Sequence, residues 1–371
     1  MTLPVLISGA GLGGVCLGQA LKKNNIPFKI FERCAKDNFS TQGYRLRIST
    51  HGVSALNYAL TPEIFSLFGK TCAEASKLGV RVRPDGSPTA PMGLPSGVSP
   101  GGKAYTIDRI TVSFLDGTTE EGSLLVGADG VRSNIRKQYV PDFQGIDTGM
   151  RLIFGKTPLT SDFLAKLPNE YRDGMSLVTN DDDNSQPVLM FESIRFPHAK
   201  ELSSIDIPDP YMYWVLVVHC SRIPSSDQNP WHLSPEEAAK LANELTSSWH
   251  SQIRTILEMS DKSQTSIRSI LSASLEITPW IPSSRVTLLG DAAHVMPPTG
   301  VMGANTALRD AADLAQRITS AGGVSHMNET VIGAYEANLR EFAKSAIEMS
   351  WRGGRTSYGL KPAEECEQIL I

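Results

Sequence analysis

A glycine-rich turn between two short apolar segments is the feature of this chain that most constrains its fold. Residues 3–8 (LPVLIS) form a nearly continuous apolar run, as expected of a strand that is buried on both faces. Three glycines then fit the pattern G-x-G-x-x-G: Gly9, Gly11 and Gly14. Apolar residues at helical spacing follow, residues 27–31 (PFKIF) predict a second strand, and Glu32 closes it. This order of strand, turn, helix, strand and acidic residue predicts a βαβ unit that binds a dinucleotide.

Each residue type in this unit has a physical reason. The first glycine allows a tight turn, the second lets the backbone approach a pyrophosphate, and the third lets the helix pack against the strand. The helix N-terminus would then face the phosphates. Glu32 lies where an acidic residue accepts ribose hydroxyls, and its charge disfavours the 2′-phosphate of NADP. The motif alone leaves FAD and NAD open, and a glycine-rich turn without a ligand is the alternative.

A second segment of this kind lies near the other end of the chain. Residues 290–305 (GDAAHVMPPTGVMGAN) directly follow the apolar run 286–289. A buried strand would end there, an Asp would follow, and prolines and glycines would lead into a new helix. Such a turn presents a carboxylate and the positive end of a helix to a crevice. Together with the glycine pattern, it predicts that the chain holds FAD. His294 in this turn is interpreted as structural rather than catalytic.

A third turn lies between these two. Residues 111–115 and 123–126 predict the strands of a hairpin that turns at Asp116-Gly117. The returning strand would lead into residues 127–136 (GADGVRSNIR), where small residues carry an Asp and two arginines. A third apolar strand therefore ends in a turn with charged side chains.

Composition and charge restrict the class of protein. The chain has 371 residues with 41% hydrophobic and 20% charged residues, as in ordinary soluble enzymes of one large or two smaller domains. A net charge of −4 gives no basic field for nucleic acid or an anionic membrane. No apolar run approaches the ~20 residues of a membrane span, and no signal-peptide pattern opens the chain, so we expect a cytoplasmic protein. The cysteines and histidines lack metal-ligand spacing, and we predict no metal site.

The middle of the chain has a different sequence pattern. Between residues 150 and 274, strand-like runs are separated by turns rich in proline and aspartate, with one helix beginning at Ser234-Pro235. This pattern predicts a separate β-rich layer. Two long helices, about 303–320 and 329–350, follow the last turn.

Taken together, the three turns resemble those of FAD-dependent monooxygenases of the p-hydroxybenzoate hydroxylase type, the group A flavoprotein monooxygenases. The resemblance covers most of the chain in order, although the β-rich middle matches only in its general pattern of strand-like runs. It implies an α/β fold in which a Rossmann-like FAD-binding domain carries an inserted β-rich substrate domain. The FAD-binding domain would comprise residues 1–75, 104–150 and 276–371, and the substrate domain residues 76–103 and 151–275.

The resemblance also assigns cofactor contacts. Glu32 would hold the adenosine ribose, Arg109 would contact the diphosphate region, and Asp129 would serve FAD and NAD(P)H. Asp291 would hydrogen-bond the ribityl chain of the flavin. Two residues would lie near the flavin entrance, Gly43 and Arg45. Three residues would cap the flavin ring, Gly303, Ala304 and Asn305.

The implied reaction is a monooxygenation, either a hydroxylation or an epoxidation. NAD(P)H would reduce FAD, and O2 would form a flavin C4a-hydroperoxide that attacks an electron-rich small molecule, aromatic or polyketide-like. A dry site would protect the hydroperoxide from water. The β-rich middle must supply the group that deprotonates the substrate, and Arg195 and Tyr213 are the candidates. An exposed strand arginine and a packed tyrosine are the alternative interpretation.

One departure from the resembled family lies at Arg109. In that family, the corresponding arginine opens a long helix, and further strands precede the next turn. Here Arg109 is followed at once by Ile110, and the alternation of apolar residues changes phase between Ile107 and Ile110. We therefore hypothesise that a helix–strand segment is missing after Arg109. An inactive or truncated relative with impaired FAD binding is thus one alternative function. A flavin-dependent halogenase is another, although only Trp280-Ile281-Pro282 remains of its expected W-x-W-x-I-P stretch.

Overall fold

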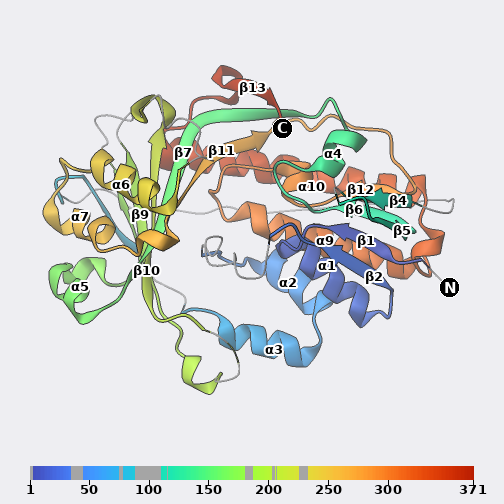
Figure 1. The fold of residues 1–371 in the computed structure, drawn as a ribbon, viewed down its shortest axis with the longest axis horizontal. Coiled ribbons are helices and arrows are strands. Elements are labelled where there is room, and N and C mark those ends of the chain that lie inside the picture. The colour runs from blue at the N-terminus through green and yellow to red at the C-terminus, as the bar shows by residue number, and fades with distance from the viewer. Residues whose placement is uncertain are drawn as a thin grey trace.

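The computed structural model describes residues 3–34, 45–74, 78–87, 110–114, 116–179, 187–202, 205, 207–224 and 233–371. They form two lobes, each built on its own sheet (Figure 1). The first lobe holds a parallel four-stranded sheet in the order β12-β6-β1-β2. Its strands are β1 (Val5–Ser8), β2 (Phe28–Phe31), β6 (Leu124–Gly127) and β12 (Val286–Leu288). The predicted βαβ unit is therefore present, with parallel strands as its pattern requires.

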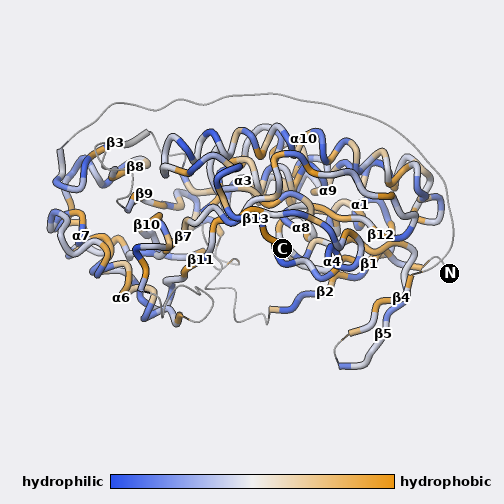
Figure 2. Tube along the Cα trace, turned by 90° about the horizontal axis from the view of Figure 1, so that it is seen from above, coloured by the Kyte–Doolittle hydropathy of each residue, from blue (hydrophilic) through white to orange (hydrophobic). Residues whose placement is uncertain are grey.

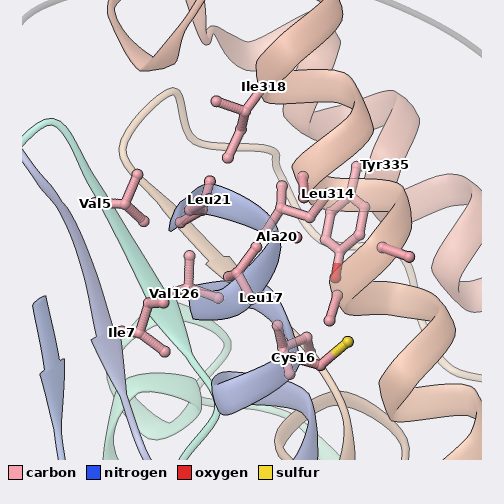
Figure 3. Close-up of a cluster of buried hydrophobic side chains, with 14 of the residues drawn as sticks. Val5, Ile7, Cys16, Leu17, Ala20, Leu21, Val126, Leu314, Ile318 and Tyr335 are labelled. Carbon is pink, nitrogen blue, oxygen red and sulfur yellow. The ribbon is translucent and has the colours of Figure 1, made fainter. Parts of the chain in front are cut away.

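Helices cover the first sheet because its central strands are apolar on both faces. The main helices of this lobe are α1 (Leu12–Lys23), α2 (Thr50–Ala59), α9 (Met302–Ser320) and α10 (Glu329–Tyr358). Figure 3 shows side chains of α1, α9 and α10 packed over β1 and β6. Ile7, Leu17 and Leu314 in this cluster are fully buried. Burying such a side chain stabilises the fold by about 1.5–3 kcal/mol, so this cluster fixes how the long C-terminal helices lie on the N-terminal unit.

The second lobe is a larger, mostly antiparallel sheet with the order β11-β7-β10-β9-β8-β3, and β13 pairs with β7. Its strands are β3 (Leu78–Val82), β7 (Gln144–Pro158), β8 (Met175–Val178), β9 (Val188–Ile194), β10 (Tyr211–His219), β11 (Ser266–Ala273) and β13 (Glu367–Leu370). Three helices accompany it on its outer side (Figure 1): α5 (Ser161–Lys166), α6 (Pro235–Leu245) and α7 (Ser251–Glu258). The β-rich middle predicted from the sequence thus forms a layer of its own.

Both faces of this second sheet are buried, which explains the unbroken apolar run in β10. Tyr213 and Val215 point to the face that packs against α10, in a cluster that includes Trp351. Trp214 and Leu216 alternate with them and point to the face covered by α6 and α7. The first of these faces is therefore the joint between the two lobes.

Three further α-helices and one hairpin belong to the described fold. They are α3 (Pro62–Thr71), α4 (Asn134–Tyr139), α8 (Asp291–His294) and the hairpin of β4 (Ile110–Ser113) with β5 (Thr119–Gly122). The sequence predicts that residues 123–126 return in this hairpin, but that prediction is wrong. Residues 119–122 pair with β4 instead, and the next residues enter the parallel sheet as β6. Figure 2 shows the hairpin extending away from the rest of the first lobe.

The predicted domain boundaries fall close to the change of sheet without matching it at every point. β7 runs through residues 150 and 151 without a break, and β13 lies in the range assigned to the first domain although it pairs with β7. The precise division therefore stays a prediction. Among the described residues, no helix is long and apolar enough to cross a bilayer.

Candidate cofactor and substrate site

The turns singled out in the sequence meet at one edge of the parallel sheet. Neighbouring parallel strands end at the same edge, so the turns after β1, β2, β6 and β12 lie side by side. Backbone hydrogen bonds join them: Gly9 N–H donates to the Phe31 carbonyl at 2.7 Å, and Ala128 N–H donates to the Ser8 carbonyl at 2.8 Å. This edge is where ligands bind in open α/β sheets.

The glycine turn is compact on one side and open on the other. Gly9 has φ +107°, and a Cβ there would overlap the Ala128 carbonyl, so only glycine fits. A Cβ at Gly14 would likewise overlap the Gly9 carbonyl. A Cβ at Gly11 would meet no atom within 4 Å. Gly11 is also the N-cap of α1 and places no side chain on the first-turn N–H groups. The helix N-terminus therefore faces open space, as the binding of a diphosphate requires.

Glu32 lies at the end of β2, beside this turn. Its carboxylate accepts hydrogen bonds from the N–H groups of Ala10 and Cys34, each at 2.8 Å. Burial raises the pKa of Glu32, but these hydrogen bonds outweigh it and hold the pKa below its ordinary value. Glu32 is thus a fixed, exposed carboxylate at the position expected of a ribose ligand.

Asp129 has a local structural role in the turn after β6. Its carboxylate accepts hydrogen bonds from the Ser133 hydroxyl at 2.5 Å and from the Asn134 N–H at 2.8 Å, and so it helps to cap α4. These bonds fix the shape of the turn at the sheet edge. A direct contact of Asp129 with FAD or NAD(P)H stays a prediction.

Arg136 links two of the turns, and sequence reasoning missed this role. The side chain is fully buried and donates hydrogen bonds to the carbonyls of Val131 at 2.8 Å and Ala292 at 3.1 Å. Burial lowers its pKa to about 10 although Asp129 opposes the shift. The only signal in the sequence was a second arginine in residues 127–136, and nothing there named a partner 156 positions away.

Asp291 is the first residue of α8 and directly follows Gly290. Its side chain is exposed by accessible area, yet the surrounding protein raises its pKa by burial, against an opposing effect of His294. Among the described residues, no hydrogen bond is formed by the Asp291 carboxylate. This carboxylate is therefore available to a ligand at the sheet edge.

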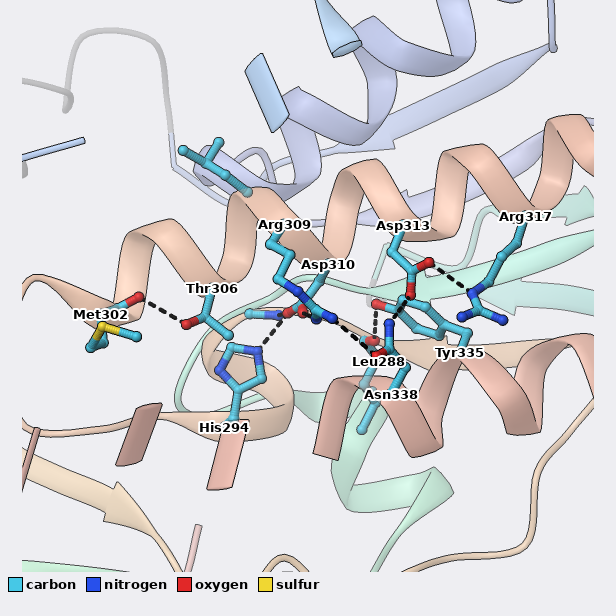
Figure 4. Close-up of polar contacts among 12 residues, drawn as sticks. Leu288, His294, Met302, Thr306, Arg309, Asp310, Asp313, Arg317, Tyr335 and Asn338 are labelled. Atoms are coloured by element: carbon cyan, nitrogen blue, oxygen red, sulfur yellow. Dashed lines mark hydrogen bonds and ion pairs between the residues drawn. The ribbon is translucent and has the colours of Figure 1, made fainter. Parts of the chain in front are cut away.

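A buried ion pair between His294 and Asp310 stabilises the turn that begins at Gly290 (Figure 4). His294 and Asp310 are both fully buried, and His294 Nε2 lies 2.5 Å from Asp310 Oδ2, which also accepts from the Gly290 N–H at 3.1 Å. Burial lowers the pKa of His294, but Asp310 and Asp291 outweigh it and raise the pKa above its ordinary value. The position of His294 agrees with the structural interpretation of this residue.

The N-terminus of α9 lies beside the segment that precedes α2. Val301, its N-cap, has φ +64° and places no side-chain hydrogen bond on the first turn. Gly303 and Ala304 are partly exposed there. Asn305 is buried and binds a facing segment, donating to the Arg47 carbonyl at 3.0 Å and accepting from the Ser49 N–H at 2.8 Å. The three residues predicted to cap a flavin ring therefore surround a helix N-terminus whose N–H groups are free of side-chain caps.

The predicted entrance and catalytic residues that the structure describes lie in two places. Arg45 forms an ion pair with the buried Glu192 of β9, and Tyr213 lies directly opposite Glu192 on β10. Arg195 lies apart from them, where its guanidinium binds Asp173 at 2.8 Å. Gly43 and Arg109, like the junction after Arg109, lie outside the described residues. The geometry therefore brings Arg45 and Tyr213 together and leaves Arg195 outside this cluster.

A separate cavity of about 530 Å³ lies beside the C-terminal half of α10. Its lining includes Trp351, Arg352 and Arg355, and none of the predicted site residues. The residues predicted to bind the cofactor lie at the sheet edge, so this cavity is not part of the candidate cofactor site.

The fold and this sheet edge define a dinucleotide-binding flavoprotein lobe joined to a β-sheet lobe. Residues 108–350 match the FAD-binding domain family, and the chain belongs to that family. The chain is 33% identical, over 98% of its own length, to the dual O-methyltransferase/FAD-dependent monooxygenase elcB of Phaeosphaeria nodorum. It is 25% identical, over 96% of its length and 95% of the relative, to the FAD-dependent monooxygenase thnD of Trichoderma harzianum. These relatives support FAD as the cofactor.

Solved structures agree with the family. A crystal structure from Photorhabdus luminescens, described as that of an FAD-containing monooxygenase, covers 96% of this chain and 99% of its own, with a TM-score of 0.77 at 28% identity. A salicylate hydroxylase with bound substrate has the same fold at 17% identity, with a TM-score of 0.65. The two-lobed architecture is therefore that of flavin monooxygenases.

The chain differs in length from several of its relatives. The chain spans about half of the first curated relatives that it matches, 47% of elcB and 48% of the CTB3 protein of Cercospora beticola. The alignment with elcB extends over 446 positions, although this chain has only 371 residues. The relative therefore has residues within the aligned region that this chain lacks, and a missing segment after Arg109 stays a hypothesis. Among the described residues, β2 pairs only with β1 and is the edge of its sheet.

Proposed function

We propose that this chain is an FAD-dependent monooxygenase that uses NAD(P)H and O2. Its substrate would be an electron-rich small organic molecule, aromatic or polyketide-like, which it hydroxylates or epoxidises. The observation that carries this proposal is the arrangement at one sheet edge of two helix N-termini without side-chain caps, those of α1 and α9, with an Asp291 carboxylate that forms no hydrogen bond among the described residues. An elongated ligand with a diphosphate at one end and an electron-accepting ring at the other suits this arrangement.

The residues present fit FAD. The space at Gly11 would take the diphosphate, and Glu32 would accept the adenosine ribose hydroxyls. Asp291 would bind the ribityl hydroxyls, and the N-terminus of α9 would place its partial positive charge beside the flavin ring. Bound FAD supplies the redox chemistry and the activation of O2, which no side chain can provide.

The chain's own residues would bind and orient the substrate and exclude water. The face of the second sheet that meets α10 is largely apolar, with Phe154, Met190 and Val215 in neighbouring strands. Such a face keeps water away from a reactive site. Tyr213, on the same face, is the residue we propose to contact the reacting hydroxyl. Arg195 is the weaker candidate because it is bound to Asp173 outside this face.

The test is oxidation of NADPH, and separately of NADH, with and without candidate phenols under air, followed by mass spectrometry of the products. A monooxygenase would consume the reductant faster with substrate and would add one oxygen atom from O2. An inactive relative with impaired FAD binding would show neither effect even with added FAD. A halogenase would instead incorporate chloride or bromide into the product, and that result would replace the present proposal.

A further inference from the structure

The cavity of about 530 Å³ beside the C-terminal half of α10 lies outside the candidate cofactor site. Its lining on α10 occupies the helical positions i, i+3, i+4, i+7 and i+8, which are Glu348, Trp351, Arg352, Arg355 and Thr356. Residues at these positions share one face of a helix, so the cavity follows a single stripe of α10. Leu275, in the segment that follows β11, also lines it. A cavity of this volume can hold a small organic molecule.

Leu275 and Trp351 supply the apolar part of this lining. The Trp351 indole N–H donates to the Ser272 hydroxyl of β11 at 3.0 Å. Because this N–H is the only polar group of the indole and already has a partner, the Trp351 ring offers a ligand only apolar surface. An ion pair between Glu276 and Lys344 of α10 links the segment of Leu275 to the helix. The apolar part of the lining is therefore held in place from two elements.

Two arginines supply the charged part of the lining. Arg352 and Arg355 are both exposed and lie three positions apart on the helix. Within the part of the chain that the structure describes, neither guanidinium group forms a hydrogen bond or an ion pair. A guanidinium group is planar and binds a carboxylate through two parallel hydrogen bonds. The Glu348 carboxylate on the same stripe would repel a second negative charge, so the lining suits a singly charged carboxylate better than a phosphate.

We propose that this cavity is a second ligand site, which binds a monocarboxylic acid with an apolar body. The carboxylate of the ligand would accept hydrogen bonds from Arg352 and Arg355, and its apolar body would lie against Leu275 and Trp351. None of the lining residues is among those predicted to bind the cofactor or the substrate of the monooxygenase. The inference therefore goes beyond the proposed function and does not depend on it.

Isothermal titration calorimetry with 2-naphthoate tests the proposal on the protein as purified. We expect saturable binding of 2-naphthoate. 2-Naphthamide keeps the ring system but has no negative charge, and it should bind about tenfold more weakly. 2-Naphthyl phosphate can carry a second negative charge beside Glu348, and it should also bind more weakly than 2-naphthoate.

Substitutions in the lining locate the binding. Arg352→Met and Arg355→Met should each weaken the binding of 2-naphthoate about threefold, and the double variant about tenfold, because water screens exposed ion pairs. Glu348→Gln removes the repelling charge and should strengthen binding. Thr356→Trp places an indole ring in the cavity from an exposed position and should abolish binding. Arg254→Met changes an exposed arginine on α7 and is the matched control, with no expected effect.

These substitutions all change exposed side chains, so each variant should keep the far-UV circular dichroism spectrum of the parent. Weaker binding in the arginine variants, together with its loss in Thr356→Trp, would support the proposal. Equal affinity of the parent and the double arginine variant, tighter binding of the amide or the phosphate, or no saturable binding of 2-naphthoate would overturn it. The titration needs no flavin, so a protein that binds 2-naphthoate in this cavity but never oxidises NAD(P)H contradicts only the proposed function.

Discussion

At the sheet edge, a single substitution should weaken FAD binding without destabilising the fold, and the glycine turn is the clearest case. Gly11 has an extended backbone, and a Cβ there would meet no protein atom within 4 Å. Gly11→Ala should therefore leave the melting temperature unchanged but fill the space of the diphosphate, weakening FAD binding about tenfold or more, which is about 1.4 kcal/mol. Flavin fluorescence titration measures this affinity. Gly69→Ala, on α3, is the glycine control outside the site, because a Cβ there also meets no atom within 4 Å. If Gly11→Ala binds FAD as tightly as the parent protein, the diphosphate does not bind at this turn.

Glu336 gives a pH prediction at the residue scale. Burial raises its pKa to about 7, although hydrogen bonds such as that from Thr287 at 2.9 Å oppose the shift. Between the unfolded value of about 4.3 and this value, the folded state binds more protons than the unfolded state. The free energy of unfolding should therefore fall as pH rises through this window.

Glu336→Gln should remove that loss, so that the free energy of unfolding of the variant relative to the parent rises by roughly 3 kcal/mol from pH 4.5 to 7.5. Urea unfolding at a series of pH values measures the difference. Glu364→Gln, at an exposed position, is the control and should show no such trend. A constant difference across the series would mean that Glu336 is not protonated in the folded state.

At the scale of elements, Asn305 joins the first turn of α9 to the segment that carries Arg45 and Arg47. Asn305→Ala leaves the part-buried Ser49 N–H and Arg47 carbonyl without this partner, which costs about 1–3 kcal/mol. It should also weaken FAD binding because the helix N-terminus loses its facing segment. Asn243→Ala, which removes only a local bond to the Ala239 carbonyl in α6, should cost less and leave FAD binding intact. Equal effects of the two variants would contradict the joining role.

Local patterns predicted the elements that carry the cofactor. The unit from β1 to Glu32 and the turn from Gly290 into α9 each depend on residues close in sequence, so that alternation, glycine spacing and helical periodicity were sufficient. The pairing of β6 was missed because its partners, β1 and β12, are more than a hundred positions away. The Arg47–Glu192 pair was missed for the same reason, since 145 positions separate the two residues and no local pattern connects them.

At the scale of the whole molecule, the stabilities of the two lobes should be coupled through the hydrophobic cluster that contains Trp351. This side chain is 4% exposed, packs between α10 and the second sheet, and donates to the Ser272 hydroxyl at 3.0 Å. Trp351→Ala should cost about 3–5 kcal/mol and speed hydrogen exchange in both lobes. Trp249→Ala removes a tryptophan of similar burial from the outer cluster of the second lobe and should speed exchange only there. Hydrogen exchange mass spectrometry distinguishes these patterns, and protection lost in one lobe alone in Trp351→Ala would contradict the joint.

The central claim is that the edge of the parallel sheet, from Gly11 to Asp291, binds FAD. The most direct measurement is the visible absorption spectrum of the purified protein after incubation with FAD and removal of the excess. We predict flavin bands at one FAD per chain, and their loss in a protein that carries both Gly11→Ala and Asp291→Ala yet keeps its far-UV circular dichroism. A folded parent protein that retains no flavin, or a double variant that retains as much as the parent, would contradict the account.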